Sequence, residues 1–328
     1  MSTTKTSPER PSKSRLAPRP TVNLIGIKAG RYLSTPGFSG EVISVGERAA
    51  YIATDEGDIL AACQDDQQPH PRSFLTDLDL SNLHVGLRTW VEGTKLWFSN
   101  GVSLPIAEAQ RWSSGPRAPV NIMSLEKLRS RCGDLLRAAI DLHEGDDLGL
   151  SLPFLINDDG AETSPDLQTA ISPLTAAGVE LIRGLLPHRR SGDFESVLKL
   201  AEQLIGLGPG LTPSGDDFVG GLVFMSRRLS SAYPEERWWE GGDLPALLTY
   251  ARSNTSRISY ALLTDLFESQ SHASLHALAH ELISDTGGFD AKFHVRQVTQ
   301  IGHSSGWDML TGILAALLPV FHRDMQES

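Results

Sequence analysis

The sequence predicts an α+β protein, in which an N-terminal β-barrel or sandwich-like domain precedes a mainly α-helical domain. Apolar and polar residues alternate from residue 21 to about residue 112, whereas beyond residue 121 the apolar residues recur with a helical period. A segment rich in proline, serine and glycine, residues 111–121, separates the two patterns. We therefore expect a disordered tail (1–20), a β-rich domain (21–115) and a helical domain (116–328) that carries the functional motifs.

The composition argues against several classes of protein. The net charge of −11 disfavours nucleic acid as a partner. Cys63 and Cys132 stand in unrelated contexts, which argues against a disulfide framework and favours a reducing, cytoplasmic location. Residues 1–20 are basic and lack the apolar centre of a signal peptide. Because no apolar run approaches the ~20 residues that span a bilayer, no membrane association is expected.

Two sets of short strands are expected in the β-rich part. Residues 41–46, 48–57 and 58–63 form the first set, and residues 87–93, 94–101 and 102–106 form the second. Within the second set, Gly93-Thr94 and Asn100-Gly101 mark the turns, and Asn-Gly is the strongest short signal for a β-hairpin. Strands at this spacing predict a small barrel or a sandwich.

The second half of the chain predicts a series of helices. The expected ranges are residues 124–142, 164–186, 193–208, about 242–267, 271–285 and 305–322. In the second of these, Ser164 is expected as the N-cap, with Pro165 at the first helical position. His272, His276 and His280 recur every four residues and are interpreted as one face of a polar helix.

The most unusual segment is GLGPGLTPSGDDFVGG, residues 206–221, which stands at the start of a helical pattern. Ser214 and Asp217 have the spacing of a capping box, with apolar residues directly after them. Gly208 and Gly210 permit a tight turn that approaches other backbone closely. A capped helix needs no second acid, so Asp216 is left for use as a general base or as a Mg²⁺ ligand.

The same helix start appears again in HSSGWDMLTGILAAL, residues 303–317. Ser305-Gly306-x-Asp308 repeats Ser214-Gly215-x-Asp217 at an offset of 91 residues, and Gly312 repeats Gly221. A glycine inside a helix costs about 1 kcal/mol relative to alanine, and a close helix–helix contact is the usual compensation. The repeat therefore predicts that the two helices cross near their glycines, with their N-termini adjacent.

Two adjacent helix N-termini predict an anion site, because each presents unpaired N–H groups and a partial positive charge. Asp217 and Asp308 are expected as caps or metal ligands, and His303 as an acid or base near neutral pH. A third segment, RSNTSRISYALL (residues 252–263), adds small polar residues. Its Arg257 has a guanidinium group of the kind that binds a phosphate or a carboxylate through two hydrogen bonds. The expected substrate- or anion-binding residues are Gly208, Gly210, Thr212, Ser214, Gly215, Thr255, Arg257, Ser259, Ser304, Ser305 and Gly306.

The segments GLGPGLTPSGDDFVGG, NTSRIS and GHSSGWDMLTG resemble the signatures of a bacterial family long labelled a domain of unknown function. The resemblance extends from about residue 22 to residue 322. One member of that family is similar in role to a subunit of oxamate carbamoyltransferase, from anaerobic allantoin degradation. That system moves a carbamoyl group between oxamate and phosphate and yields carbamoyl phosphate. The resemblance implies a role in purine degradation, as one part of an enzyme with additional, unrelated subunits.

The leading hypothesis is a subunit of a carbamoyltransferase-type enzyme that acts on a small amide or ureido acid with phosphate or carbamoyl phosphate. Asp216 and His303 are its expected catalytic residues. Two alternatives stay open: a non-catalytic subunit that holds an anionic metabolite, and a Mg²⁺-dependent hydrolase that uses Asp216, Asp217 and Asp308. No other cofactor is indicated, and a homo-oligomer is compatible with the sequence.

Overall fold

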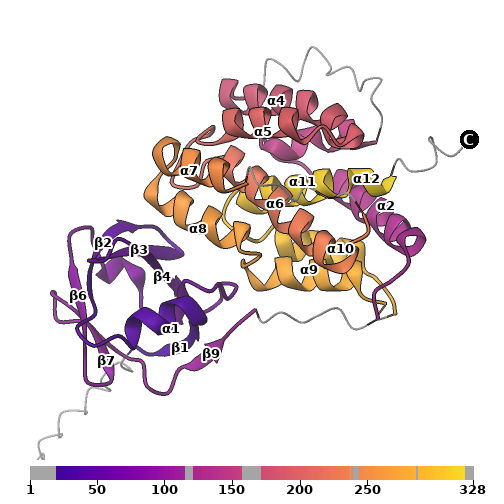
Figure 1. Ribbon diagram of the computed structural model, residues 1–328. Helices are drawn as coiled ribbons and strands as arrows, with labels where there is room; N and C mark the ends of the chain where they lie inside the picture. The colour runs from indigo at the N-terminus through magenta and orange to yellow at the C-terminus, as the bar shows by residue number, and fades with distance from the viewer. Residues whose placement is uncertain are drawn as a thin grey trace, which may run out of the picture.

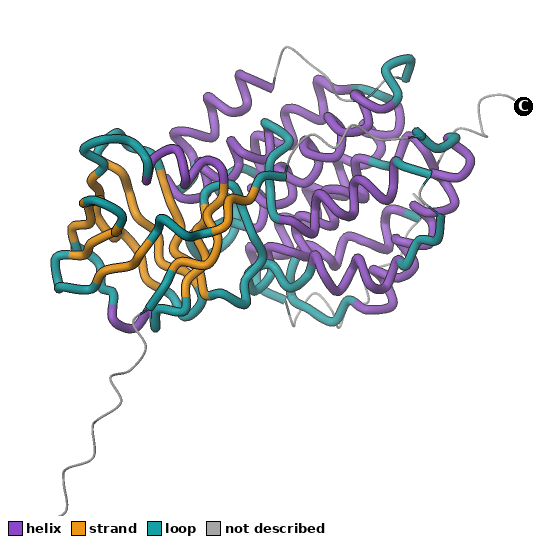
Figure 2. The backbone as a smooth tube through the Cα atoms, turned by 90° about the horizontal axis from the view of Figure 1, so that it is seen from below, coloured by secondary structure: helices purple, strands orange, loops and turns teal. Residues whose placement is uncertain are grey.

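The computed structural model describes residues 20–114, 121–156, 171–236, 238, 244–285 and 287–321. Strands gather at one end of the molecule and helices at the other (Figures 1 and 2), which confirms the α+β class. The expected tail, apart from residue 20, and the expected helix start at Ser164 and Pro165 lie outside the described residues. No helix among the described residues is long and apolar enough to cross a membrane.

The strands of the described region form one nine-stranded curled sheet in the order β8-β7-β6-β2-β3-β4-β5-β1-β9. The strands are β1 (Val22–Gly26), β2 (Ser39–Val45), β3 (Ala49–Thr54), β4 (Ile59–Gln64), β5 (Ser73–Thr76), β6 (Arg88–Glu92), β7 (Lys95–Phe98), β8 (Ser103–Pro105) and β9 (Gln110–Trp112). All six predicted strands are confirmed, whereas β1, β5 and β9 were not predicted. The short helix α1 (Ile27–Leu33) packs against the apolar face of the sheet.

The helical part comprises α2 (Leu125–Leu142), η2 (Leu148–Leu155), α4 (Pro173–Ser191), α5 (Phe194–Leu204), α6 (Ser214–Ala232), α7 (Leu244–Asn254), α8 (Arg257–Phe267), α9 (Ala273–Ile283), α10 (Ala291–Val298), α11 (Ser305–Ala316) and α12 (Leu318–Phe321). The predicted helix over 242–267 is two helices, because the Ser256 hydroxyl accepts a hydrogen bond from Ser259 N at 3.0 Å and caps α8. The predicted helix over 305–322 is interrupted at Leu317.

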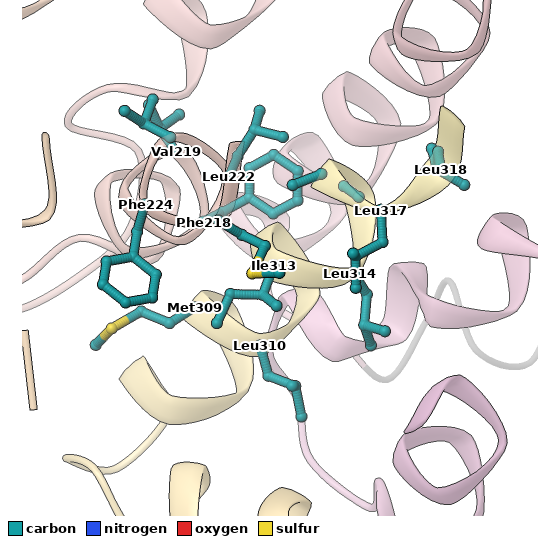
Figure 3. Packing of buried hydrophobic residues seen from close by; sticks show 14 of the residues in the cluster. Phe218, Val219, Leu222, Phe224, Met309, Leu310, Ile313, Leu314, Leu317 and Leu318 are labelled. Carbon is teal, nitrogen blue, oxygen red and sulfur yellow. The ribbon is translucent and has the colours of Figure 1, made fainter. Parts of the chain in front are cut away.

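Helices α6 and α11 form the centre of the helical core. Figure 3 shows apolar side chains of both helices, among them Phe218, Leu222 and Ile313, gathered where the helices meet. A Cβ atom on Gly221 would lie 2.2 Å from Met309 O, and one on Gly312 would lie 2.0 Å from Phe218 O. The predicted crossing at the two glycines is thereby confirmed. Phe218 and Met309 also stand 91 residues apart, so each helix contacts the other through equivalent positions.

A buried ion cluster joins the sheet to the helices. Arg72, which precedes β5, donates to Asp265 of α8 through Nε at 2.6 Å and through Nη2 at 2.9 Å. Lys28 of α1 also donates to Asp265, whose side chain is fully buried. Burial raises the pKa of Asp265, and the two cations oppose that shift. These contacts fix the position of α8 relative to the sheet.

Candidate functional site

The N-termini of α6 and α11 lie side by side, because the crossing at Gly221 and Gly312 brings the two helix starts together. Thr212 Oγ1 lies 3.2 Å from Ser305 Oγ. The Ser305 hydroxyl lies close enough to Asp217 to lower the pKa of that carboxyl, and the Ser214 hydroxyl acts in the same way on Asp308. Each helix therefore places its first serine against the aspartate of the other helix, a pairing that was not predicted from the sequence.

The expected capping roles of Ser214, Asp217 and Asp308 are wrong. Ser214 is the first residue of α6, and the N-cap is Pro213, which has no side chain able to cap. The N-cap of α11, Ser304, forms no capping hydrogen bond through its side chain. Asp308 instead accepts from Leu148 N at 2.9 Å and lies against the Ser214 and Ser304 hydroxyls, while Asp217 lies against the Ser305 hydroxyl. Both helix N-termini consequently lack a side-chain cap, and this leaves them suited to a bound anion.

The glycines of the motif mark positions where backbone passes close to backbone. Gly208 has a φ of +131°, and a Cβ atom there would lie 2.6 Å from Ser214 N, at the start of α6. Only glycine fits, because any side chain would block the helix N-terminus. A Cβ on Gly215 would lie 1.9 Å from Leu204 O, and one on Gly306 would lie 2.3 Å from Val298 O. The ends of α5 and α10 thus lie directly against the starts of α6 and α11, while Gly210 faces open space at a φ of +88°.

Asp217 and Asp308 form a pair of buried carboxyl groups beside these N-termini. Asp217 is 5% exposed and Asp308 is fully buried. Burial raises the pKa of Asp217 well above its usual range, and the charge of Asp308 adds to this rise. Burial likewise raises the pKa of Asp308 to about 7, although Leu148 N donates to its Oδ1 at 2.9 Å. The pair therefore holds protons near neutral pH and does not carry two negative charges towards an incoming anion.

Asp216 is not free, contrary to the sequence interpretation. Gly206 N donates to its Oδ1 at 2.7 Å, and the hydroxyls of Thr255 and Ser259 donate to its Oδ2. The side chain is 2% exposed, and burial raises its pKa against the effect of these three donors. Asp216 thus ties the glycine-rich loop and the start of α8 to α6. Its catalytic role stays a prediction.

We expect Asp216→Ala to lower the free energy of unfolding by roughly 3 kcal/mol, because one buried and two partly buried donors lose their acceptor. Chemical denaturation followed by circular dichroism measures this change. Asp134→Ala is the matched control, since Asp134 is exposed and contacts only Arg137 in its own helix, and its effect should stay within about 0.5 kcal/mol. Equal stability of the two variants would show that Asp216 does not hold these segments together.

His303 and Arg257 differ from the other predicted residues in their exposure. His303 lies in the exposed turn before α11, and Arg257 is the exposed first residue of α8. The structure brings neither side chain into the buried aspartate pair. Their roles as acid–base catalyst and anion ligand stay predictions that depend on a bound substrate or partner.

A second histidine, His143, was not found by sequence reasoning. Its Nε2 lies 2.9 Å from Asp147 Oδ1, and its ring packs edge-on against Trp307, with ring centres 4.9 Å apart. Asp147 precedes Leu148, whose amide binds Asp308, and its charge raises the pKa of Asp308 further. The only sequence signal is the acidic turn HEGDD, and no local spacing connects that turn with a motif 160 residues away.

The described residues offer a metal ion no ligand cluster. In residues 20–114, 121–156 and the later described segments, no group of three or more histidine, cysteine, aspartate or glutamate side chains is placed to hold a metal ion. Two aspartates of the hydrolase alternative have different neighbours: Asp216 accepts from Thr255 and Ser259, while Asp308 accepts from Leu148 N. Within the described residues, this geometry gives that alternative no ligand set.

Comparison with known proteins identifies a likeness for the segment that contains the site. The family described as "Oxamate carbamoyltransferase subunit AllH" matches residues 204–317. These residues run from the end of α5 to the end of α11, and so contain both helix starts and the Thr255–Ser259 segment. The sheet lies outside the matched residues. No solved structure matches the chain.

Proposed function

We propose that the chain is a subunit of a carbamoyltransferase-type enzyme that acts on a small amide or ureido acid with phosphate or carbamoyl phosphate. The observation that carries this proposal is the meeting of two helix N-termini without side-chain caps at a buried pair of carboxyl groups. The likeness of residues 204–317 to an oxamate carbamoyltransferase subunit supports the same reaction class.

The phosphate group is held by the two helix starts. Each N-terminus contributes about half a positive charge, although Gly215 N and Gly306 N already donate to Leu207 O and Ile301 O, both at 2.9 Å. Thr212, Ser214 and Ser305 add hydroxyl groups at the same place. The raised pKa values of Asp217 and Asp308 reduce the repulsion that two ionised carboxylates would exert on the phosphate. Fixed donors of this kind also stabilise an oxyanion that develops on the carbamoyl group.

The proton is handled by Asp308. Transfer of the carbamoyl group to phosphate breaks a carbon–nitrogen bond and forms a carbon–oxygen bond, and the leaving nitrogen must gain a proton. A carboxyl group with a pKa of about 7 can give that proton in one direction and take it back in the other. Burial raises the pKa of Asp217 and so favours its protonated form, which donates a hydrogen bond to the substrate in this proposal.

Partner subunits complete the enzyme in this proposal. The matched family is described as a subunit, so its activity belongs to an assembly. Leu211, which precedes Thr212, keeps 44% of its surface exposed beside the helix starts. An exposed apolar side chain at this place suits a protein surface that covers the site and excludes water.

Calorimetric titration with phosphate and carbamoyl phosphate tests the anion site, with and without partner subunits. We expect Ser214→Ala combined with Ser305→Ala to weaken binding at this site at least tenfold, because two hydroxyl groups at the helix starts are lost. Ser130→Ala combined with Ser191→Ala is the control, since both serines are exposed and far from α6 in sequence. If neither ligand binds the assembled protein at this site, the proposed function is wrong.

A further inference from the structure

A second group of polar side chains lines a cavity where the sheet meets the helices. The cavity has a volume of about 260 Å³ and is lined, among others, by Trp112, Ser114, Arg228, His276, His280 and Glu281. Trp112 ends β9, the last strand, whereas the charged side chains come from α6 and α9. The cavity therefore lies between the two parts of the chain.

This cavity is separate from the paired helix starts. Arg228 follows Ser214 by 14 residues in the same helix. At a rise of 1.5 Å per residue, the two positions lie about 21 Å apart along α6. A small ligand that occupies one site does not reach the other, so the cavity is not explained by the proposed carbamoyl transfer.

Arg228 is a half-buried cation without a counter-ion. Burial lowers its pKa, and among the described residues it forms no ion pair. Glu281 lines the same cavity, but one of its carboxylate oxygens lies 2.8 Å from His294 Nε2 of α10. A guanidinium group withdrawn from water without an anion is unfavourable, and a bound anion removes that cost.

His276 supplies a hydrogen-bond donor that also lacks an acceptor. Ser271 N donates to His276 Nε2 at 3.0 Å, so this nitrogen carries no proton. Burial, together with the charge of Arg228, lowers the pKa of His276 to about 4, which keeps the ring neutral. The proton of the neutral ring therefore sits on Nδ1, which is buried and has no hydrogen-bond partner. The histidine face of α9 is thus turned inward, and its interpretation as the polar face of a helix is wrong.

We propose that this cavity binds a small oxyanion, a carboxylate or a phosphate, with Arg228 as its charge partner and His276 as a hydrogen-bond donor. Trp112 and Ser114 form the wall that comes from the sheet. Ser114 is held there by its hydrogen bond to Gln270, directly before α9. An anion in this place touches both parts of the chain and so stabilises their arrangement.

Calorimetric titrations of the full chain with inorganic phosphate and with acetate, at constant ionic strength, test the cavity. The chain that carries Ser214→Ala and Ser305→Ala serves as the background, because its other anion site is removed. We expect one binding event to remain for phosphate or acetate, and Arg228→Gln in this background to weaken it at least tenfold. If phosphate gives the remaining binding event, the cavity binds phosphates; if acetate gives it, the cavity binds carboxylates.

Arg227→Gln is the matched control, because Arg227 is the exposed neighbour of Arg228 in the same helix. The Arg227→Gln variant should bind the anion as tightly as the background chain does. The anion should raise the melting temperature of the background and of Arg227→Gln, but not that of Arg228→Gln. The cavity proposal is overturned if the background binds neither anion, or if Arg228→Gln binds as well as Arg227→Gln. If the two serine substitutions alone abolish anion binding, the proposed function stands and the cavity proposal does not.

Discussion

Replacing Gly312 by alanine is expected to destabilise the fold by roughly 3 kcal/mol, the upper part of the usual range for overpacking. The new Cβ atom would lie 2.0 Å from Phe218 O and 2.8 Å from Leu222 N. Both neighbours are backbone atoms of α6 and cannot rotate aside, so the two helices must separate. Gly221→Ala should act similarly, since its Cβ would lie 2.2 Å from Met309 O.

Urea denaturation followed by circular dichroism measures these changes. Gly184→Ala is the matched control, because Gly184 also lies inside a helix but has no atom within 4 Å of an added Cβ. This control should be more stable than the wild type by up to about 1 kcal/mol, from helix propensity alone. A Gly312→Ala protein that behaves like Gly184→Ala would refute the close crossing of α6 and α11.

Replacing Asp308 by asparagine is expected to lower turnover of the assembled enzyme by about 10²-fold or more, because the group that exchanges a proton is lost. The shape of the side chain and the hydrogen bond from Leu148 N can be kept. Asp134→Asn, at an exposed position, should leave turnover unchanged. Unchanged turnover of Asp308→Asn, together with intact phosphate binding, would favour a subunit that only holds an anion.

The same substitution should stabilise the protein at high pH. The folded-state pKa of Asp308, about 7, lies above its ordinary value of 3.8. The folded state therefore binds the proton more tightly than the unfolded state. This carboxyl group lowers the free energy of unfolding progressively as the pH rises from about 4 to about 7, by up to about 4 kcal/mol. Asparagine does not ionise, so the Asp308→Asn variant does not lose stability in this way as the pH rises.

Urea unfolding of wild type and Asp308→Asn at pH 4 and pH 8 measures the difference. The variant should gain stability relative to the wild type between the two pH values. Loss of activity with a gain in stability is typical of a residue kept for function. If the variant instead loses stability relative to the wild type as the pH rises, the raised pKa is wrong, and so is the role of Asp308 as a proton donor.

The features that sequence predicted are those encoded locally. Alternating apolar residues and the Asn-Gly turn located β6, β7 and β8, because pairing through a short turn needs only neighbouring residues. The repeat around Ser214 and Ser305 located the helix crossing, because a glycine at the same place in two related helices commonly marks a close contact between them. Strand β1 escaped prediction because its partners, β5 and β9, are about 50 and 86 residues away.

The predictions that proved wrong at the site also relied on local sequence patterns. The capping box was inferred from Ser214 and Asp217 alone, yet the helix begins one residue earlier than a Ser214 cap requires. The donors to Asp216 come from Gly206, Thr255 and Ser259, and no local pattern connects these three positions. Sequence therefore indicated which residues come together, but not which of them are already engaged by the fold.

The reciprocal contacts of α6 and α11 relate the two helix starts by an approximate local dyad. Each element of one half has a counterpart at an offset of 91 residues: Ser214 with Ser305, and Asp217 with Asp308. The exception is Asp216, whose counterpart is Trp307. Asp216 anchors the start of α8, whereas Trp307 packs against His143. A ligand with two unlike ends consequently meets unlike surroundings across the dyad, which gives it a single preferred direction of binding.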